Sequence, residues 1–190
     1  MADRQMRRER RACVAQARGT VLDVGIGTGL NLPWYDPGRV TRVIGVEPSA
    51  GMLRRAGWRA AQAPFAVDLR QAGAEDMPVD DASVDTAVIT WTLCTIPLAH
   101  EALCQVRRVL KPGGRLIFVE HGRAADPAVA SQQDLFNPLW RRLAGGCNLN
   151  RPIDELIAAA DFRFEALTAG YLSGPVRAVR YTYRGVAVAR

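Results

Sequence analysis

Short apolar runs alternate along the chain with segments in which apolar residues recur every three or four positions. The runs are rich in β-branched residues and are bounded by glycine, proline or charged residues, as buried strands are. The other segments have the periodicity of amphipathic helices. The pattern predicts strands at residues 20–24, 40–46, 65–71, 84–90, 115–120, 162–170 and 176–189.

Helices are predicted between these strands, and two of them have candidate caps. Ser49 can cap a helix that runs to about Ala61, and Asn150 lies where a cap would precede a short helix. Strands that alternate with helices indicate an α/β fold with a mostly parallel sheet covered on both faces. Residues 171–175 are too few for a helical crossover, so we expect the last two strands to form an antiparallel hairpin. The predicted helices cover residues 3–18, 30–35, 50–61, 98–110 and 152–160.

Length and composition fit one globular domain over residues 1–190. Hydrophobic residues make up 48% of the chain, yet no apolar run reaches the length of a membrane span. The polar, arginine-rich start lacks the apolar middle of a secretory signal, so we expect a cytoplasmic protein. Residues 1–19 are expected to form an N-terminal helix or lid. Residues 122–150, rich in Pro, Gly, Trp and Phe, are expected to form an irregular substrate-side insertion.

The net charge of +6 draws attention to anionic partners. Only Lys111 is a lysine among the 25 basic residues, and the arginine bias runs through the whole chain. The one dense run, residues 4–11, is typical of a solvated helix face rather than of a surface for nucleic acid or lipid head groups. We expect no nucleic-acid partner and leave peripheral membrane contact open. Four cysteines without a C-x-x-C pair, and two histidines, predict neither disulfides nor a metal site.

A glycine-rich loop follows the first predicted strand. Gly25, Gly27 and Gly29 allow a tight turn and let backbone N–H groups approach a ligand closely. Glu47, at the tip of the second strand, can accept hydrogen bonds from both hydroxyls of a ribose. Dinucleotide-binding and methyl-donor-binding folds share these features. Leu30 occupies a position where a dinucleotide loop would have glycine, which disfavours a pyrophosphate and therefore an NAD enzyme.

Four motifs occur in order between residues 21 and 122: VLDVGIGTG, GVEPSAGML, AEDMPVDDASVD and ALCQVRRVLKPGGRLIFVEHG. Together they resemble the motifs of class I S-adenosylmethionine-dependent methyltransferases, in the ubiquinone-biosynthesis-like branch. The resemblance implies a Rossmann-like seven-stranded sheet of order 3-2-1-4-5-7-6 with strand seven antiparallel. It also implies S-adenosyl-L-methionine as cofactor, S-adenosyl-L-homocysteine as product and a small-molecule methyl acceptor. The cofactor-binding residues that it implies are Asp23, Gly25, Gly27, Gly29, Asn31, Glu47, Pro48, Met52, Ala74, Glu75, Thr90 and Trp91.

Different residues of this cofactor-binding set are expected to contact different parts of S-adenosylmethionine. The resemblance assigns the glycines to the methionine part, Glu47 to the ribose, and Thr90 and Trp91 to the sulfonium end. Asp23 is expected to support the loop. Because these positions end successive parallel strands, they are expected to meet at one edge of the sheet.

The adenine side contains one departure from the family pattern. Ala74 and Glu75 are expected to face the adenine, but Gly73 stands where many members have an aspartate that contacts the adenine amino group. Either Glu75 substitutes for that aspartate or backbone groups hold the adenine. Met52 is open to two interpretations, as a cover for the ring face or as a core residue.

The acceptor is suggested by a second resemblance. Residues 137–140 and 146–151 resemble the DPxW and GCNLxR motifs of the methyltransferase-like seven subfamily, whose animal members methylate alkyl thiols. A thiol acceptor reacts as the thiolate, and Arg151 or another lid arginine can supply positive charge to stabilise it. The first hypothesis is therefore methylation of a small thiol.

His121 and Glu120 are the candidate catalytic residues, because either can take a proton at the end of the fifth strand. The alternative for His121 is a hydrogen-bonded loop residue. Cys94 and Cys147 are expected to be packing residues. Rival functions are lipid or quinone methylation and a cofactor-binding module without turnover.

Overall fold

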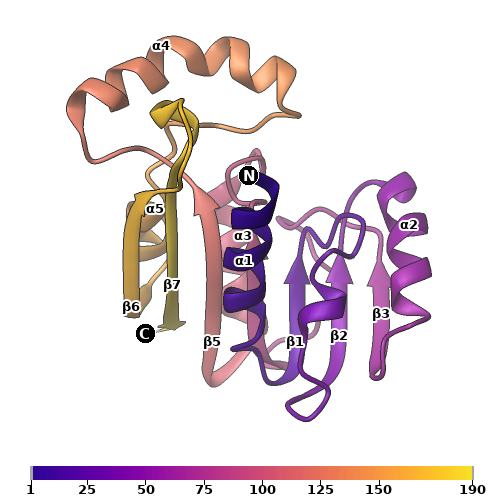
Figure 1. The fold of residues 1–190 in the computed structure, drawn as a ribbon. Coiled ribbons are helices and arrows are strands. Elements are labelled where there is room, and N and C mark those ends of the chain that lie inside the picture. The colour runs from indigo at the N-terminus through magenta and orange to yellow at the C-terminus, as the bar shows by residue number, and fades with distance from the viewer. Residues whose placement is uncertain (1, 190) are drawn as a thin grey trace.

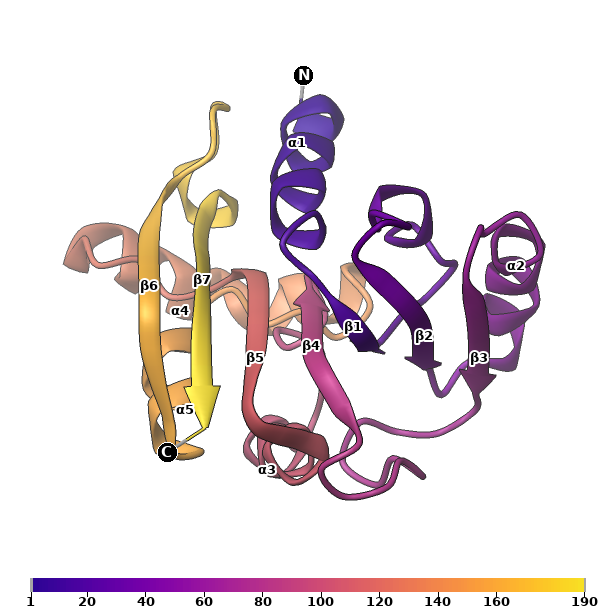
Figure 2. The same ribbon diagram turned by 90° about the horizontal axis from the view of Figure 1, so that it is seen from below.

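The computed structural model describes residues 2–189, and within them seven strands form one sheet of order β3-β2-β1-β4-β5-β7-β6 (Figures 1 and 2). The first five strands in the chain run parallel, whereas β7 pairs antiparallel with both β5 and β6. The fold class, the strand order and the final hairpin are therefore confirmed. The strands are β1 Gly19–Val24, β2 Val40–Val46, β3 Ala66–Arg70, β4 Val84–Thr90, β5 Leu110–His121, β6 Phe162–Tyr171 and β7 Tyr181–Ala189.

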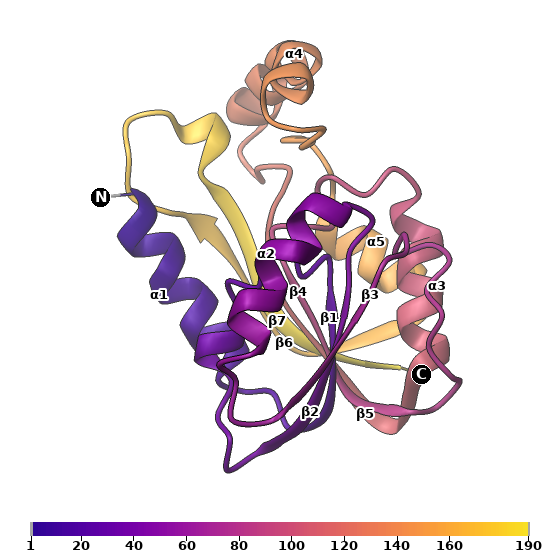
Figure 3. The same ribbon diagram turned by 90° about the vertical axis from the view of Figure 1, so that its right-hand side faces the viewer.

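Helices cover both faces of the sheet (Figure 3). One apolar cluster joins the sheet to α1 and α2, and a second joins it to α3 and α5. Because both faces are covered, β1 and β4 are buried along most of their length, which explains their continuous apolar runs. The helices are α1 Ala2–Val14, α2 Ala50–Ala60, α3 Ala99–Val109, α4 Pro127–Leu143 and α5 Ile153–Ala159, with short 3-10 turns η1 Leu32–Trp34 and η2 Arg177–Val179.

Several boundaries differ from the predictions; β5, for example, begins at Leu110 and not at residue 115. The helix α1 ends four residues before position 18, and the stretch predicted as the start of the last strand instead forms η2, which packs on α4. Pro152, not Asn150, precedes α5, and no side chain of the described residues caps this helix. Asn150 instead donates a 2.8 Å hydrogen bond to Asp134. No helix among residues 2–189 combines the length and the apolar character that crossing a bilayer demands.

The insertion at residues 122–150 is not irregular, because it contains the helix α4 above the carboxyl edge of the sheet (Figure 1). Asp126 caps this helix by accepting a hydrogen bond from the Ala128 N–H, and Pro127 occupies its first turn. Its pattern was hard to recognise because polar Gln133 is fully buried, while several leucines face outward. The Gln133 amide holds the backbone of the preceding loop and of η2.

Candidate active site

A cleft of about 730 Å³ opens at the carboxyl edge of β1, β2 and β4. Its walls come from α1, the glycine loop, the loops after β2, β3 and β4, and the segment that follows α4. Crevices at this edge are where open α/β sheets bind ligands. Nine of the predicted cofactor residues line it: Gly25, Gly27, Glu47, Pro48, Met52, Ala74, Glu75, Thr90 and Trp91.

Each glycine of the loop is required for a different physical reason. At Gly25 (φ 63°) an added Cβ would lie 2.1 Å from Cγ2 of Thr92, so only glycine lets these two loops meet. At Gly27 (φ 56°) the nearest atom to such a Cβ would be 3.9 Å away, which leaves its backbone open toward the cleft. Gly29 does not line the cleft but packs against Ala56 of α2. Gly27 is therefore the glycine whose surface is free for a ligand.

Glu47 joins the glycine loop to the end of β2. Its carboxylate accepts a 3.2 Å hydrogen bond from the Gly27 N–H and a 2.9 Å hydrogen bond from the Ser49 N–H. The side chain is nearly buried, yet it borders the cleft. Each carboxylate oxygen can accept more than one hydrogen bond, so both retain capacity for hydroxyl groups of a ligand.

Asp23 and Asn31 lie behind the loop, outside the cleft wall. The fully buried Asp23 carboxylate accepts hydrogen bonds from the Asn31 amide (2.8 and 3.0 Å) and the Tyr35 hydroxyl (3.0 Å). Burial raises the pKa of Asp23 to about 6, although these hydrogen bonds and the charge of Arg10 oppose the shift. Asp23 was expected to support the loop, and the structure places it there. Asn31 was predicted only as a cofactor-binding residue, but its amide faces the Asp23 carboxylate, so it too has a supporting position.

Arg10 was missed from the sequence and is the one cation among the described residues that line the cleft. It donates hydrogen bonds to Asn31 Oδ1 (2.5 Å) and Thr90 Oγ1 (2.8 Å), and it lies over the Trp91 ring at 5.1 Å. The run that contains it was predicted to be a solvated face. A signal was present, because Arg10 shares a helical stripe with the buried Val14 and so faces the sheet.

The adenine side supports the first of the two alternatives for the missing aspartate. A Cβ at Gly73 would lie 3.0 Å from Oε2 and 3.1 Å from Cδ of Glu75, and both residues line the cleft. The Glu75 carboxylate thus occupies the space that an aspartate at position 73 would enter.

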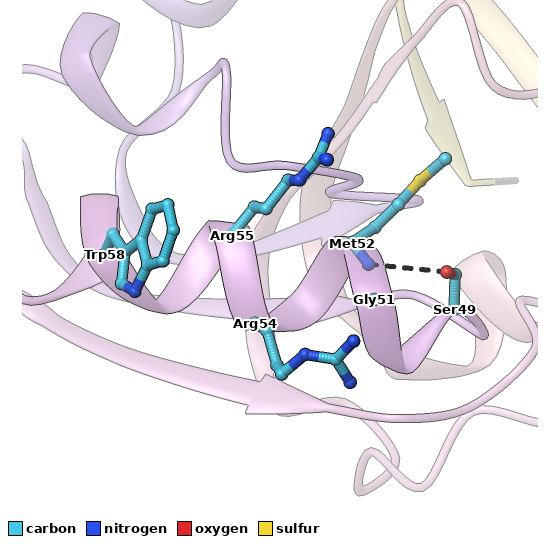
Figure 4. A pocket seen from close by; sticks show the side chains of 6 residues that line it. All are labelled: Ser49, Gly51, Met52, Arg54, Arg55 and Trp58. Carbon is cyan, nitrogen blue, oxygen red and sulfur yellow. Dashed lines mark hydrogen bonds between the residues drawn. The ribbon is translucent and has the colours of Figure 1, made fainter.

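Met52 is 47% exposed at the edge of the cleft, so it is not a core residue. Ser49 caps α2 by accepting a 3.3 Å hydrogen bond from the Met52 N–H, as predicted (Figure 4). Figure 4 also shows that Met52 and Arg55 project from the same side of α2. A second hollow of about 470 Å³ lies on the outer surface of this helix and shares Met52 with the cleft.

The opposite side of the cleft is formed by the loop after β4, which Glu120 holds from below. The buried Glu120 carboxylate accepts hydrogen bonds from the backbone N–H groups of Thr92 (2.6 Å), Leu93 (2.9 Å) and Cys94 (3.2 Å). Burial raises its pKa to about 7 against the effect of these bonds. Glu120 does not line the cleft, so the predicted role as a base for the acceptor does not fit its position.

The GCNLNR motif at residues 146–151 fixes this loop from above. Asn148 donates from both its backbone and its side chain to the Cys94 carbonyl, at 2.9 Å each. Arg151 donates to the carbonyls of Ile96 (2.7 Å) and Leu93. Arg151 is therefore occupied with backbone and does not face the cleft, and the arginine that does is Arg10.

Trp91 separates the cleft from His121. Trp91 has a left-handed backbone (φ 51°), and its indole N–H is buried without a partner among the described residues. The ring of His121 lies behind it, with centroids 6.3 Å apart, and does not reach the cleft wall.

The sheet topology, the glycine loop and the carboxylate of Glu47 at the end of β2 together define a nucleotide-cofactor site of the kind that methyltransferases have. A family model described as "Methyltransferase domain" matches residues 22–118, about half of the chain. The chain therefore belongs to this family, that of the class I S-adenosylmethionine-dependent methyltransferases, whose cofactor is S-adenosyl-L-methionine.

Its relatives include enzymes with different acceptors. The chain is 34% identical to the human thiol S-methyltransferase TMT1A over 75% of its own length and 59% of that protein. It is 32% identical to human thiol S-methyltransferase TMT1B, over 85% of the chain and 70% of that protein. A phosphatidylethanolamine N-methyltransferase of Cereibacter sphaeroides is 34% identical over 67% of the chain and 64% of its own length. The chain thus spans between 59% and 70% of the length of these proteins.

A solved structure supports the fold independently. A geranyl diphosphate methyltransferase in complex with SAM superposes with a TM-score of 0.70 at 16% identity, covering 97% of this chain and 84% of that chain. The present cleft fits such a cofactor: the Gly27 backbone is open, the Glu47 carboxylate has spare acceptor capacity, and the Trp91 N–H has no partner within residues 2–189.

Proposed function

We propose that this methyltransferase acts on a small thiol. The observation that carries the proposal is the composition of the acceptor side of the cleft. The described residues there bear no group that titrates near neutral pH: Trp91, Thr92, Thr95, Ile96, Pro97, Ala144 and Gly145. An alcohol or a protonated amine has to lose a proton to a base before it attacks. A thiol ionises on its own to a useful extent near pH 7, so it needs no such base.

The residues of the cleft have a limited set of tasks in this scheme. When bound, S-adenosylmethionine supplies a methyl group already activated on a cationic sulfonium, so alignment and exclusion of water are what the protein adds. Glu47 would hold the ribose hydroxyls, and Arg10 would pair with the methionine carboxylate. The positive charge of Arg10 also favours an anionic thiolate in the same cleft. Glu120 keeps the acceptor loop in shape without touching the reacting atoms.

A panel of small thiols, amines and phenols, incubated with a methyl-labelled donor, tests the proposal. We expect methylation of thiols, with the rate rising as pH approaches the pKa of the thiol. Glu47→Ala serves as a control that loses donor binding. Turnover of amines or phenols but never of thiols would remove the thiol claim. Calorimetric donor binding without turnover of any acceptor would favour a binding module.

Lipid or quinone methylation is the second candidate, and the outer face of α4 favours it. Four large apolar side chains are 53–76% exposed there, at spacings that place them on one stripe, with Arg141 and Arg142 in the same last turn. This helix leads directly into the Ala144–Gly145 segment of the cleft. The exposed apolar residues are Leu135, Phe136, Leu139 and Leu143.

Co-sedimentation with anionic and neutral vesicles tests the second candidate. Binding to anionic vesicles that is lost in Leu139→Glu would support a membrane-borne acceptor, and absence of binding would argue against it.

We also propose a cytoplasmic location, supported by four cysteines that are unpaired in the described chain.

A further inference from the structure

Three soft metal-binding side chains meet behind the acceptor loop, although they are far apart in the sequence. The sulfurs of Cys94 and Cys147 and a ring nitrogen of His121 all lie within 4.8 Å of one another. Cys94 comes from the loop after β4, His121 ends β5, and Cys147 follows α4. The sequence predicted no metal site because no two of these residues have ligand spacing, and the fold removes that objection.

The backbone around the cluster is fixed by hydrogen bonds that join the three segments. Asn148, next to Cys147, donates twice to the Cys94 carbonyl, and Glu120, next to His121, accepts from the Cys94 N–H. The three side chains are therefore held together by their neighbours in the chain, and not only by their own contacts. Such preorganisation is what a metal site requires of its scaffold.

The three ligand atoms would have to move only slightly closer together to bind a metal ion. In tetrahedral zinc sites the bonds are about 2.3 Å to sulfur and about 2.0–2.1 Å to nitrogen, so ligand atoms lie about 3.5–3.8 Å apart. A closure of about 1 Å by side-chain rotation brings the present donors to that spacing. Trp140 lies close to the Cys147 thiol, and its indole N–H is buried with no other hydrogen-bond partner among the described residues. Metal-bound thiolates accept such N–H groups as outer hydrogen bonds.

We propose that Cys94, His121 and Cys147 bind one thiophilic divalent metal ion of the zinc type. The ion ties the segment after α4 to the loop after β4, and both of these line the acceptor side of the cleft. Cys94 and Cys147 themselves do not line the cleft, so the metal acts on the shape of the acceptor side. The site does not depend on the proposed thiol acceptor, since metal binding is measured without methyl transfer.

Metal content of the full chain, purified without chelator, gives the first test. We expect about one equivalent of zinc per chain, removable by a chelator, and a thiolate-to-metal charge-transfer band when cobalt(II) is added to the metal-free protein. Cys147→Ser and His121→Asn should lose the stoichiometric metal. Trp140→Phe should weaken binding by roughly tenfold or more, as loss of an outer hydrogen bond does.

Cys104 supplies a matched control. Its sulfur lies 3.6 Å from Nε2 of His100 on the exposed side of α3, and no third ligand joins this pair within the part of the chain that the structure describes. Cys104→Ser should retain the metal. Loss of metal in Cys104→Ser with retention in Cys147→Ser would overturn the proposal. If the folded wild-type protein contained no stoichiometric metal and gave no cobalt band, the proposal would be overturned too. Peptide mass spectrometry that found a Cys94–Cys147 disulfide in protein kept in a reducing buffer would also overturn it.

Discussion

The donor half and the acceptor half of the cleft are built in different ways. In the donor half, Glu47 contacts Gly27 and Ser49, and all three belong to short motifs at the ends of neighbouring parallel strands. In the acceptor half, the loop after β4 takes its shape from Asn148 and Arg151, which are more than fifty positions away in the chain. Donor binding is thus encoded locally, whereas acceptor binding depends on the docking of a distant segment.

This difference explains how the acceptor specificity can vary while the donor site stays the same. The hydrogen bonds of Glu47 in the donor half go to backbone N–H groups of nearby motifs, so they tolerate side-chain changes elsewhere. The acceptor half changes whenever the segment after α4 changes its docking, even if no residue that touches the acceptor is replaced. A thiol S-methyltransferase and a phosphatidylethanolamine N-methyltransferase are both 34% identical to this chain over their matched lengths, although their names give different acceptors.

The largest effect is expected from Gly25→Ala, because Gly25 lies where the two halves touch. The new Cβ would lie 2.1 Å from Cγ2 of Thr92, at a positive φ. Strain and overpacking together should lower the free energy of unfolding by about 3–5 kcal/mol and abolish donor binding. Gly145→Ala has a similar φ of 60° but no atom within 4 Å, so it should cost only about 1–2 kcal/mol. Chemical denaturation measures both, and equal losses would show that the halves are not in tight contact.

Arg151→Ala should have the next largest effect, and it should affect the acceptor half alone. It leaves the Leu93 and Ile96 carbonyls without their donor, at a cost of about 2–4 kcal/mol in stability. The KM for the acceptor should rise while the donor Kd stays unchanged. Arg151→Lys keeps the charge but loses the planar arrangement of donors, and it should recover only part of the activity. A donor Kd that rises in parallel would mean that the halves are not separable.

The same division explains what could be read from the sequence. The alternation of strands and helices, the final hairpin, the Ser49 cap, the glycine loop and Glu47 follow from local patterns. The strand order and the other lining residues were implied by the resemblance of the motifs to a known family. Arg10 was misread because charge was weighed above its place on an apolar helical stripe. The helix α4 was missed because a buried Gln133 and exposed leucines invert the usual pattern. Contacts such as Asn148 to Cys94 have no local signature at all.

Glu120 lies beneath the acceptor half and should make its stability depend on pH. Its pKa is near 7 in the folded protein and near 4.5 when unfolded, so the folded state binds the proton more tightly between these values. Its contribution to stability is present below about pH 4.5 and is lost as pH rises through 7, by up to about 1.4 kcal/mol per pH unit inside that window.

Glu120→Gln removes this titration, because the amide resembles the protonated acid. The difference in free energy of unfolding between wild type and variant should therefore change with pH between about 4.5 and 7, in disfavour of wild type as pH rises. Urea denaturation at several pH values measures it. Parallel profiles for the two proteins would show that Glu120 is ionised throughout the range.

The smallest predicted effect tests whether the donor half is as local as it looks. Glu75→Ala should weaken donor binding by about tenfold, because the adenine loses one charged acceptor. Adding Gly73→Asp to that variant should restore most of the affinity, since the aspartate enters the space that Glu75 vacates. Gly73→Asp alone should weaken binding, because two carboxylates then compete for one place. Calorimetric titration with the donor gives all three values. A double variant no better than Glu75→Ala would show that adenine recognition also depends on contacts outside this loop, and the donor half would then resemble the acceptor half.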